Sequence, residues 1–127
     1  MGMFVISKRT NGDYKFVFTS RKGKTIFTSL SCKQKSDCEK IIEAIAGDIS
    51  QFTFRKNSTP SGKHFFRLSK DGFILATSRK YSTPLMLQKG IDEITKYVLT
   101  AEILDFSADK SIFPPEEEVF ADATENN

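Results

Sequence analysis

The sequence predicts an α+β protein made of two copies of a strand–strand–strand–helix unit. Alternating apolar and polar residues, interrupted by glycine turns, occur in two sets, and each set is followed by an apolar stripe with helical spacing. From the glycine turn onward the two sets superpose with a shift of 49 residues, so that Gly23 matches Gly72 and Ile42 matches Ile91. A chain of 127 residues is long enough to bury the core of one compact domain.

Three short strands are expected in the first copy. Phe4–Lys8 leads through an Asn-Gly turn to Tyr14–Thr19, whose aromatic residues alternate with Lys15, Val17 and Thr19. The chain turns again at Gly23 and returns as Thr25–Ser29. These segments predict an antiparallel meander.

A helix should follow these strands. Its apolar stripe has i, i+3, i+4, i+7 spacing and consists of Cys38, Ile41, Ile42 and Ile45. The start is open, because Ser36 begins a capping-box pattern while alignment with the second copy favours a cap near Gln34. Gly47 is the expected end.

The second copy repeats this order from Phe52-Thr53-Phe54 onward. His64–Ser78 contains an Asp-Gly dipeptide between apolar runs, which predicts a hairpin. Thr83 as N-cap and Pro84 at the first helical position predict the second helix. Its stripe is Leu87, Gly90, Ile91, Ile94 and Val98. Ala101–Phe106 could form one more strand.

Charge divides the chain into two parts. Residues 1–100 contain 18 Lys or Arg against 8 Asp or Glu, whereas residues 101–127 contain Lys110 alone against eight acids. We therefore expect a basic domain over residues 1–106 and an acidic, poorly ordered tail over residues 107–127. The tail could screen the basic body, bind another protein, or stay solvated.

Several classes of function lack their sequence signals. No apolar run approaches the roughly 18 residues of a membrane span. With two cysteines and one histidine, neither a disulfide scaffold nor a zinc site is expected, and reduced thiols fit a cytoplasmic protein. Gly23-Lys24-Thr25 resembles the end of a phosphate-binding loop, but Phe18 stands where that motif needs glycine. We expect no cofactor, no metal and no enzymatic activity.

Two single residues have both a chemical and a structural interpretation. His64 could be catalytic beside a suitable partner, but it aligns with Tyr14 and is expected to be a partly buried aromatic substitute. Cys38 lies on the apolar stripe and should pack as a small hydrophobic residue. Cys32 is the thiol expected to be exposed.

Residues spread over both copies resemble the YegP-like family, domain of unknown function 1508. In the first copy they are Gly12, Tyr14, Phe16, Gly23, Ile26, Thr28, Ser29, Lys35, Cys38, Glu39 and Ile42. In the second they are Gly62, Phe66, Leu68, Gly72, Leu75, Thr77, Ser78, Tyr81, Ser82, Gly90 and Ile91. The chain departs from the family pattern at Cys32, Pro84, Leu87 and Gln88, and in its acidic tail.

This resemblance implies two βββα repeats, over residues 3–49 and 50–106, in one antiparallel sheet with both helices on one face. It also implies that Ala101–Phe106 is a final strand exchanged between the repeats. Members with one copy form homodimers that tandem copies mimic, so we expect a monomer with pseudo-twofold symmetry or a weak homodimer. The family has no established activity, so the resemblance assigns no functional residue.

The face of the sheet without helices is the candidate binding face. Strand alternation predicts that it carries interleaved basic and apolar side chains: Lys15, Val17, Phe27, Arg55, Phe65, Arg67, Ile74 and Ala76. A non-enzymatic module that binds a protein through this face or the tail is the function favoured. Nucleic-acid binding by the basic body, modulated by the tail, is the alternative. A solvated face in which long basic side chains cover the aromatic rings is the third interpretation.

Overall fold

The computed structural model describes residues 2–107, so most of the predicted tail, residues 108–127, lies outside the described residues. The first copy comprises β1 (Met3–Lys8), β2 (Tyr14–Thr19), β3 (Thr25–Ser29), α1 (Lys35–Gly47) and the short 3-10 helix η1 (Ile49–Gln51). The second comprises β4 (Thr53–Ser58), β5 (His64–Lys70), β6 (Phe73–Ser78), α2 (Pro84–Tyr97) and η2 (Val98–Thr100), and the described part ends with β7 (Glu102–Asp105). Both predicted βββα units are therefore confirmed.

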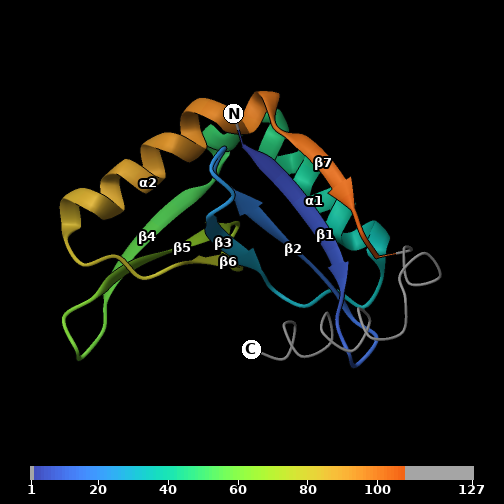
Figure 1. Ribbon diagram of the computed structural model, residues 1–127, viewed down its shortest axis with the longest axis horizontal. Helices are drawn as coiled ribbons and strands as arrows, with labels where there is room; N and C mark the ends of the chain where they lie inside the picture. The colour runs from blue at the N-terminus through green and yellow to red at the C-terminus, as the bar shows by residue number, and fades with distance from the viewer. Residues whose placement is uncertain (1, 108–127) are drawn as a thin grey trace.

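All these strands belong to one 7-stranded sheet in the order β4-β5-β6-β3-β2-β1-β7 (Figure 1). The two copies meet where β3 pairs with β6, and every pairing is antiparallel except that of β1 with β7. The last strand of the second copy thus lies beside the first strand of the first copy. This arrangement confirms the predicted exchange of the final strand.

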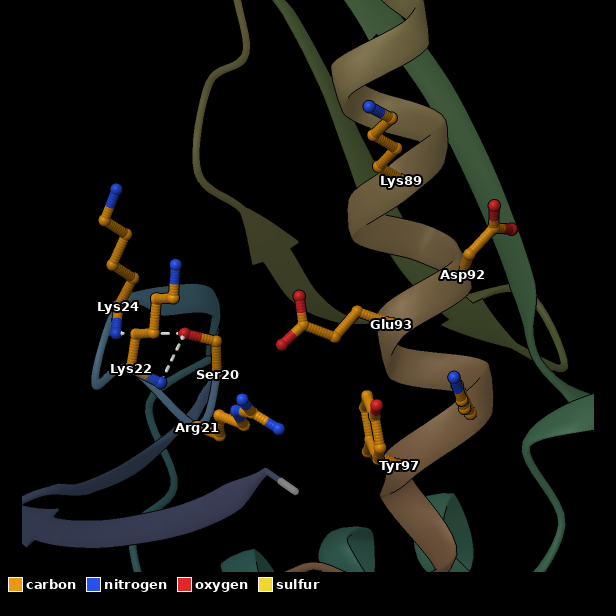
Figure 2. A pocket seen from close by; sticks show the side chains of 9 residues that line it. Ser20, Arg21, Lys22, Lys24, Lys89, Asp92, Glu93 and Tyr97 are labelled. Atoms are coloured by element: carbon orange, nitrogen blue, oxygen red, sulfur yellow. Dashed lines mark hydrogen bonds between the residues drawn. The ribbon is translucent and has the colours of Figure 1, made fainter.

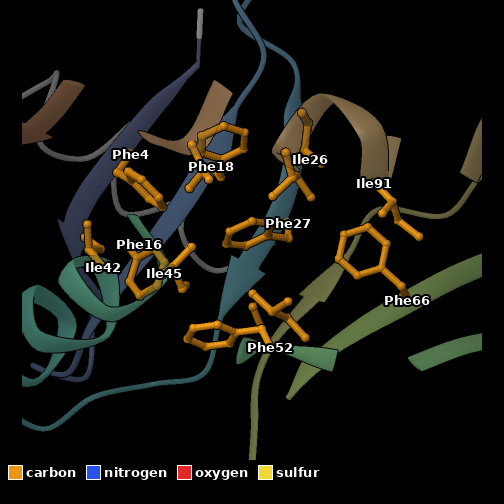
Figure 3. Packing of buried hydrophobic residues seen from close by; sticks show 14 of the residues in the cluster. Phe4, Phe16, Phe18, Ile26, Phe27, Ile42, Ile45, Phe52, Phe66 and Ile91 are labelled. Atoms are coloured by element: carbon orange, nitrogen blue, oxygen red, sulfur yellow. The ribbon is translucent and has the colours of Figure 1, made fainter. Parts of the chain in front are cut away.

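One hydrophobic cluster joins the sheet to both helices, so both helices cover the same face. Phe4, Phe16 and Phe18 from the first copy are fully buried with the stripe of α1, as Figure 3 shows for Ile42 and Ile45. In the second copy Phe66 and Leu68 belong to the same cluster, together with Leu87, Ile91 and Ile94 of α2. The predicted helical stripes are thus the core-facing sides of the helices.

A register shift in each copy corrects the predicted binding face. Phe18 pairs with Phe27, but the next pair is Thr19 with Thr25, which leaves Ile26 as an extra residue in β3. Such a bulge changes the alternation of side chains by one position. Phe27 is consequently fully buried, with its ring stacked on that of Phe18 at 5.5 Å (Figure 3). Its prediction as an outward residue is wrong.

The second copy contains the same irregularity. Leu68 pairs with Ala76, whereas Ser69 pairs with Ile74, so Leu75 is the extra residue. Ala76 is 2% exposed and faces the core, although simple alternation predicted the opposite side. The bulge is therefore a property of the repeat.

The turns and helix ends follow local sequence chemistry. Asp71 and Gly72 have φ values of 54° and 83°, as a type I′ hairpin turn requires, and they confirm the predicted hairpin. Gly23 lies in the turn between β2 and β3, with a φ of 85°, and opens no helix. The first helix starts after Gln34, which settles the position left open by the sequence. Thr83 accepts a hydrogen bond from the Met86 N–H at 3.1 Å, as predicted for an N-cap.

Candidate interaction surface

The register of the sheet aligns one residue from every strand across the helix-free face. From the β4 edge to the β7 edge, this cross-sheet row consists of Arg55, Arg67, Thr77, Thr28, Val17, Val5 and Leu104. Adjacent strands lie about 4.8 Å apart, so the row spans roughly 29 Å along the sheet. One end is basic, the middle is small and polar, and the other end is apolar.

Three more predicted residues flank this row. On β2, Lys15 lies two residues before Val17 and pairs with Ser7 of β1. On β5, Phe65 lies two residues before Arg67 and pairs with Asn57 of β4, and on β6 Ile74 pairs with Ser69 of β5. Ile74 keeps 44% of its surface exposed, and Lys15 and Phe65 are half-buried. Six of the seven candidate residues thus lie on one face, and only Phe27 does not.

Two arginines face each other at the basic end of the row. Arg55 and Arg67 are direct cross-strand partners, and both are exposed. Within residues 2–107 neither guanidinium forms an ion pair with an acidic side chain. Like charges in directly opposite positions destabilise a sheet, so this pair costs free energy in the isolated protein.

Arg67 also contacts the aromatic ring beside it. Its guanidinium carbon lies 5.4 Å from the centroid of the Phe65 ring, which is a cation–π geometry. The guanidinium partly covers the ring, as the solvated-face interpretation expects. It leaves less of the ring surface available for stacking on a nucleic-acid base.

The register explains why sequence reasoning missed much of the row. Thr28, Thr77, Val5 and Leu104 belong to it, yet nothing in their own strands distinguishes them. Their alignment depends on the β3–β6 contact and on the parallel β1–β7 pairing. The repeat alone could have indicated the threonines, because they occupy equivalent positions 49 residues apart.

His64 lies at a repeat-equivalent position at the start of β5, and both cysteines are buried. His64 pairs through its backbone with Tyr81, just as Tyr14 pairs with Cys32, so it occupies the expected aromatic position. Cys32 is 4% exposed, which corrects its prediction as the exposed thiol. Burial is the main cause that raises the pKa of both Cys32 and Cys38, and it favours the unreactive neutral thiols.

An open depression lies between the β2–β3 turn and α2. Its lining includes Arg21, Lys22 and Lys24 of the turn and Asp92 and Glu93 of the helix, and its volume is about 480 Å³. Figure 2 shows Arg21 and Glu93 pointing into the space between the two elements. The hydroxyl oxygen of Ser20 accepts hydrogen bonds from the Lys22 and Lys24 backbone N–H groups at 3.3 Å, which holds the turn. Because both signs of charge line it, the depression selects no single class of ligand.

Two other kinds of site are absent from the described part of the chain. In residues 2–107 no three His, Cys, Asp or Glu side chains gather where they could hold a metal ion. The helices in the same range are too short and too polar to cross a membrane. The helix-free face is therefore the candidate site to which the described geometry points.

The fold and this face define a small tandem-repeat α+β protein with an open sheet surface. Residues 60–105 match the family described as "Domain of unknown function (DUF1508)". The chain is 28% identical over 95 residues to the UPF0339 protein YegP of Escherichia coli (strain K12), covering 73% of this chain and 86% of the relative. It is 26% identical over 110 residues to YegP of Yersinia pestis, covering 84% and 97%. The resemblance of the chain to the YegP-like family, indicated by its sequence, is thus confirmed, with the family model matching its second copy.

Solved structures share the fold. The solution NMR structure of yegP from Escherichia coli, titled a protein of unknown function, has a TM-score of 0.74 at 23% identity and covers 84% of this chain and 94% of its own. A UPF0339 protein of Shewanella oneidensis has a TM-score of 0.75 at 25% identity and covers 86% and 94%. These relatives support the fold and supply no activity.

Proposed function

We propose that this protein is a non-enzymatic interaction module that binds a protein partner through its helix-free face. The cross-sheet row is the observation on which the proposal depends. Its basic end has two exposed arginines without acidic partners in residues 2–107, and its other end has the half-buried apolar side chains of Val17, Val5 and Leu104. A partner surface with carboxylates at one end and apolar groups at the other would complement both.

The arginine pair gives the partner a specific chemistry. A guanidinium binds a carboxylate through two parallel hydrogen bonds, and arginine is enriched among residues that dominate binding energy. A carboxylate placed between Arg55 and Arg67 would also remove their mutual repulsion. Binding is thus favoured twice, by new hydrogen bonds and by relief of a cost already present.

The experiment compares the proteins captured by three forms of the immobilised chain. These are the wild type, a face variant with Arg55→Glu and Arg67→Glu, and a control with Lys33→Glu and Lys40→Glu. The control makes the same charge change at exposed positions near α1. A partner retained by the wild type and the control but lost from the face variant supports the proposal. Equal capture by the face variant contradicts it.

Nucleic-acid binding is the second candidate, favoured by the basic charge of residues 1–100. Arg55, Arg67 and Lys15 could contact phosphates along the same face, whereas Phe65 already has a guanidinium against its ring. Affinity for an oligonucleotide should then fall steeply with salt, and Arg67→Ala should reduce that slope by about one. Absence of binding at low salt eliminates this candidate.

A further inference from the structure

The two copies differ at one edge of the sheet. The outer edge of β1 is covered by the parallel strand β7, but β4, which occupies the equivalent position in the second copy, is the last strand at the opposite edge. Figure 1 shows β4 and β7 at opposite ends of the sheet. Among residues 2–107 no strand pairs with the outer side of β4. In the described part of the chain, no strand takes the place beside β4 that β7 takes beside β1.

The hydrogen bonds identify which backbone groups of β4 point outward. His64 of β5 exchanges both of its backbone hydrogen bonds with Tyr81, so it faces away from β4. Backbone direction alternates along a strand, so Phe65 and Arg67 of β5 face β4 and bond its Asn57 and Arg55. The N–H and C=O groups of Phe54, Lys56 and Ser58 therefore point to the open edge.

The first copy shows the role of the equivalent groups. There the Phe106 N–H donates to the Ile6 C=O at 2.9 Å, and β7 pairs with β1 from Met3 to Ile6. Ile6 and Lys56 are equivalent residues, 50 positions apart. The outward groups of β4 are thus arranged as a second docking site for a parallel strand.

The side chains of β4 specify a different strand from β7. Val5 and Ile6 lie opposite Leu104 and Asp105 of β7, and the residues equivalent to Val5 and Ile6 in β4 are Arg55 and Lys56. A strand docked on β4 in the same register would lie opposite Phe54, then Arg55 and then Lys56. Arg55 lies on the helix-free face and Lys56 on the helix side, so the second and third positions of the docked strand would each face a cation. An apolar residue followed by two acidic residues matches this sequence of side chains.

An ion pair in the first copy shows how such a strand is held. Lys35 Nζ lies 2.9 Å from Asp105 Oδ2, so a lysine on the helix side anchors the acidic residue that ends β7. Lys56 also lies on the helix side, because it alternates with Arg55 and its ammonium donates to Gln88 Oε1 of α2 at 2.7 Å. It is placed to anchor an acidic residue in the same way.

We propose that the outer edge of β4 binds an extended acidic segment of a partner protein, which adds to the sheet as a strand parallel to β4. A second copy is a poorer occupant, because antiparallel pairing of two β4 strands would set Arg55 and Lys56 against the same cations. This site shares Arg55 with the helix-free face, but it depends on the outward backbone groups of β4, so amide exchange at β4 tests it separately from the proposed function.

The probe is a labelled peptide with the sequence of residues 101–107 carrying Leu104→Glu, which places acids opposite both cations. We expect saturable binding to the full chain, with slower hydrogen exchange at the Phe54, Lys56 and Ser58 amides. A peptide with Leu104→Lys and Asp105→Lys should not bind. The proposal is overturned if hydrogen exchange slows at amides outside β4, or if the peptide does not bind at low salt. In either case the charges of β4 would serve only to keep an open edge strand from aggregating.

Matched variants separate strand addition from simple charge attraction. Lys56→Pro and Lys56→Ala remove the same charge, but only proline removes the outward N–H. The β4–β5 ladder keeps its bonds in both, because this N–H faces the open edge. We expect the proline variant to bind about tenfold more weakly than the alanine variant, corresponding to roughly 1.4 kcal/mol. Equal affinities overturn the proposal.

Two further comparisons identify the occupant and allow for misfolding. If Lys56→Pro fails to fold, Arg55→Glu with Lys56→Glu keeps the backbone and should abolish binding.

The full chain with Glu116→Gln, Glu117→Gln and Glu118→Gln should bind the peptide with unchanged affinity. Tighter binding by that variant would show that the chain's own terminus competes, and concentration-dependent dimers broken by the peptide would show a second copy. Either result overturns the choice of a partner protein.

Discussion

The Tyr81 hydroxyl occupies the space that a side chain at Gly90 would need, since a Cβ built at Gly90 collides with it. The residues at the equivalent positions of the first copy are Cys32 and Ile41, so there the helix residue is the large one and its counterpart of Tyr81 is the small one. Tyr81 is 9% exposed, and burial raises the pKa of its hydroxyl.

Gly90→Ala should destabilise the protein, although alanine is the better helix former. The added methyl must displace the Tyr81 ring, and such overpacking costs about 1–3 kcal/mol. The matched control is Gly47→Ala, whose Cβ meets no atom within 4 Å. Urea unfolding measures both variants. If the Gly90→Ala protein is as stable as the Gly47→Ala control, the Tyr81 ring does not fill the space beside Gly90.

Phe27→Ala should cost about 3–5 kcal/mol, because Phe27 is fully buried against Phe16 and Phe18. Phe65→Ala, which removes the same ring from the helix-free face, should cost much less. Chemical denaturation of the two variants measures the difference. If both variants lose similar free energies of unfolding, Phe27 does not face the core and β3 lacks the register shift.

Acid should weaken the attachment of β7. Removal from water opposes ionisation of Asp105, but hydrogen bonds from Ser107 and Lys35 outweigh it and lower the pKa of the carboxyl group. A lowered folded-state pKa gives stability that is complete well above the ordinary value of 3.8 and is lost as the pH falls through the folded-state pKa.

Hydrogen exchange of β7 between pH 6 and pH 3 tests this dependence. Opening of β7 should become more frequent toward the acid end in the wild type, after correction for intrinsic exchange. Asp105→Asn should remove most of the change, whereas Glu102→Gln should retain it. A wild type whose β7 protection is independent of pH would contradict the role of the ion pair.

Arg55→Glu should stabilise the isolated protein while weakening partner binding. The substitution turns a like-charge cross-strand pair into an opposite-charge pair with Arg67, which is worth roughly 0.2–1 kcal/mol. The stability of Arg55→Gln should lie between that of the wild type and that of Arg55→Glu. Thermal unfolding measures the gain, and a loss of stability in Arg55→Glu would show that the arginines do not repel each other.

Local chemistry made much of the fold predictable. The Asp71-Gly72 turn, the Thr83 cap and the stripe ending at Ile45 each depend on neighbours within a few residues, and all three are present. The exchanged strand came from the family resemblance and not from local patterns. Phe27 was misplaced because a bulge depends on how two strands meet, which alternation along one strand does not contain.

The candidate site was predictable only in part for the same reason. Phe65 and Arg67 could be assigned to the helix-free face by counting along β5. The pairing of Arg55 with Arg67, and the continuation of the row to Leu104, depend on strand order and register. The open edge of β4 is likewise a property of the whole sheet.

Photocrosslinking tests the proposed helix-free interface most directly. A benzoylphenylalanine replaces Ile74 on that face in one protein and Leu85 on α2 in the other, since these side chains are 44% and 66% exposed. We predict that position 74 crosslinks one defined partner protein and that Arg55→Glu with Arg67→Glu abolishes the product. The same partner crosslinked from position 85, or no product from position 74, would contradict the proposed interface.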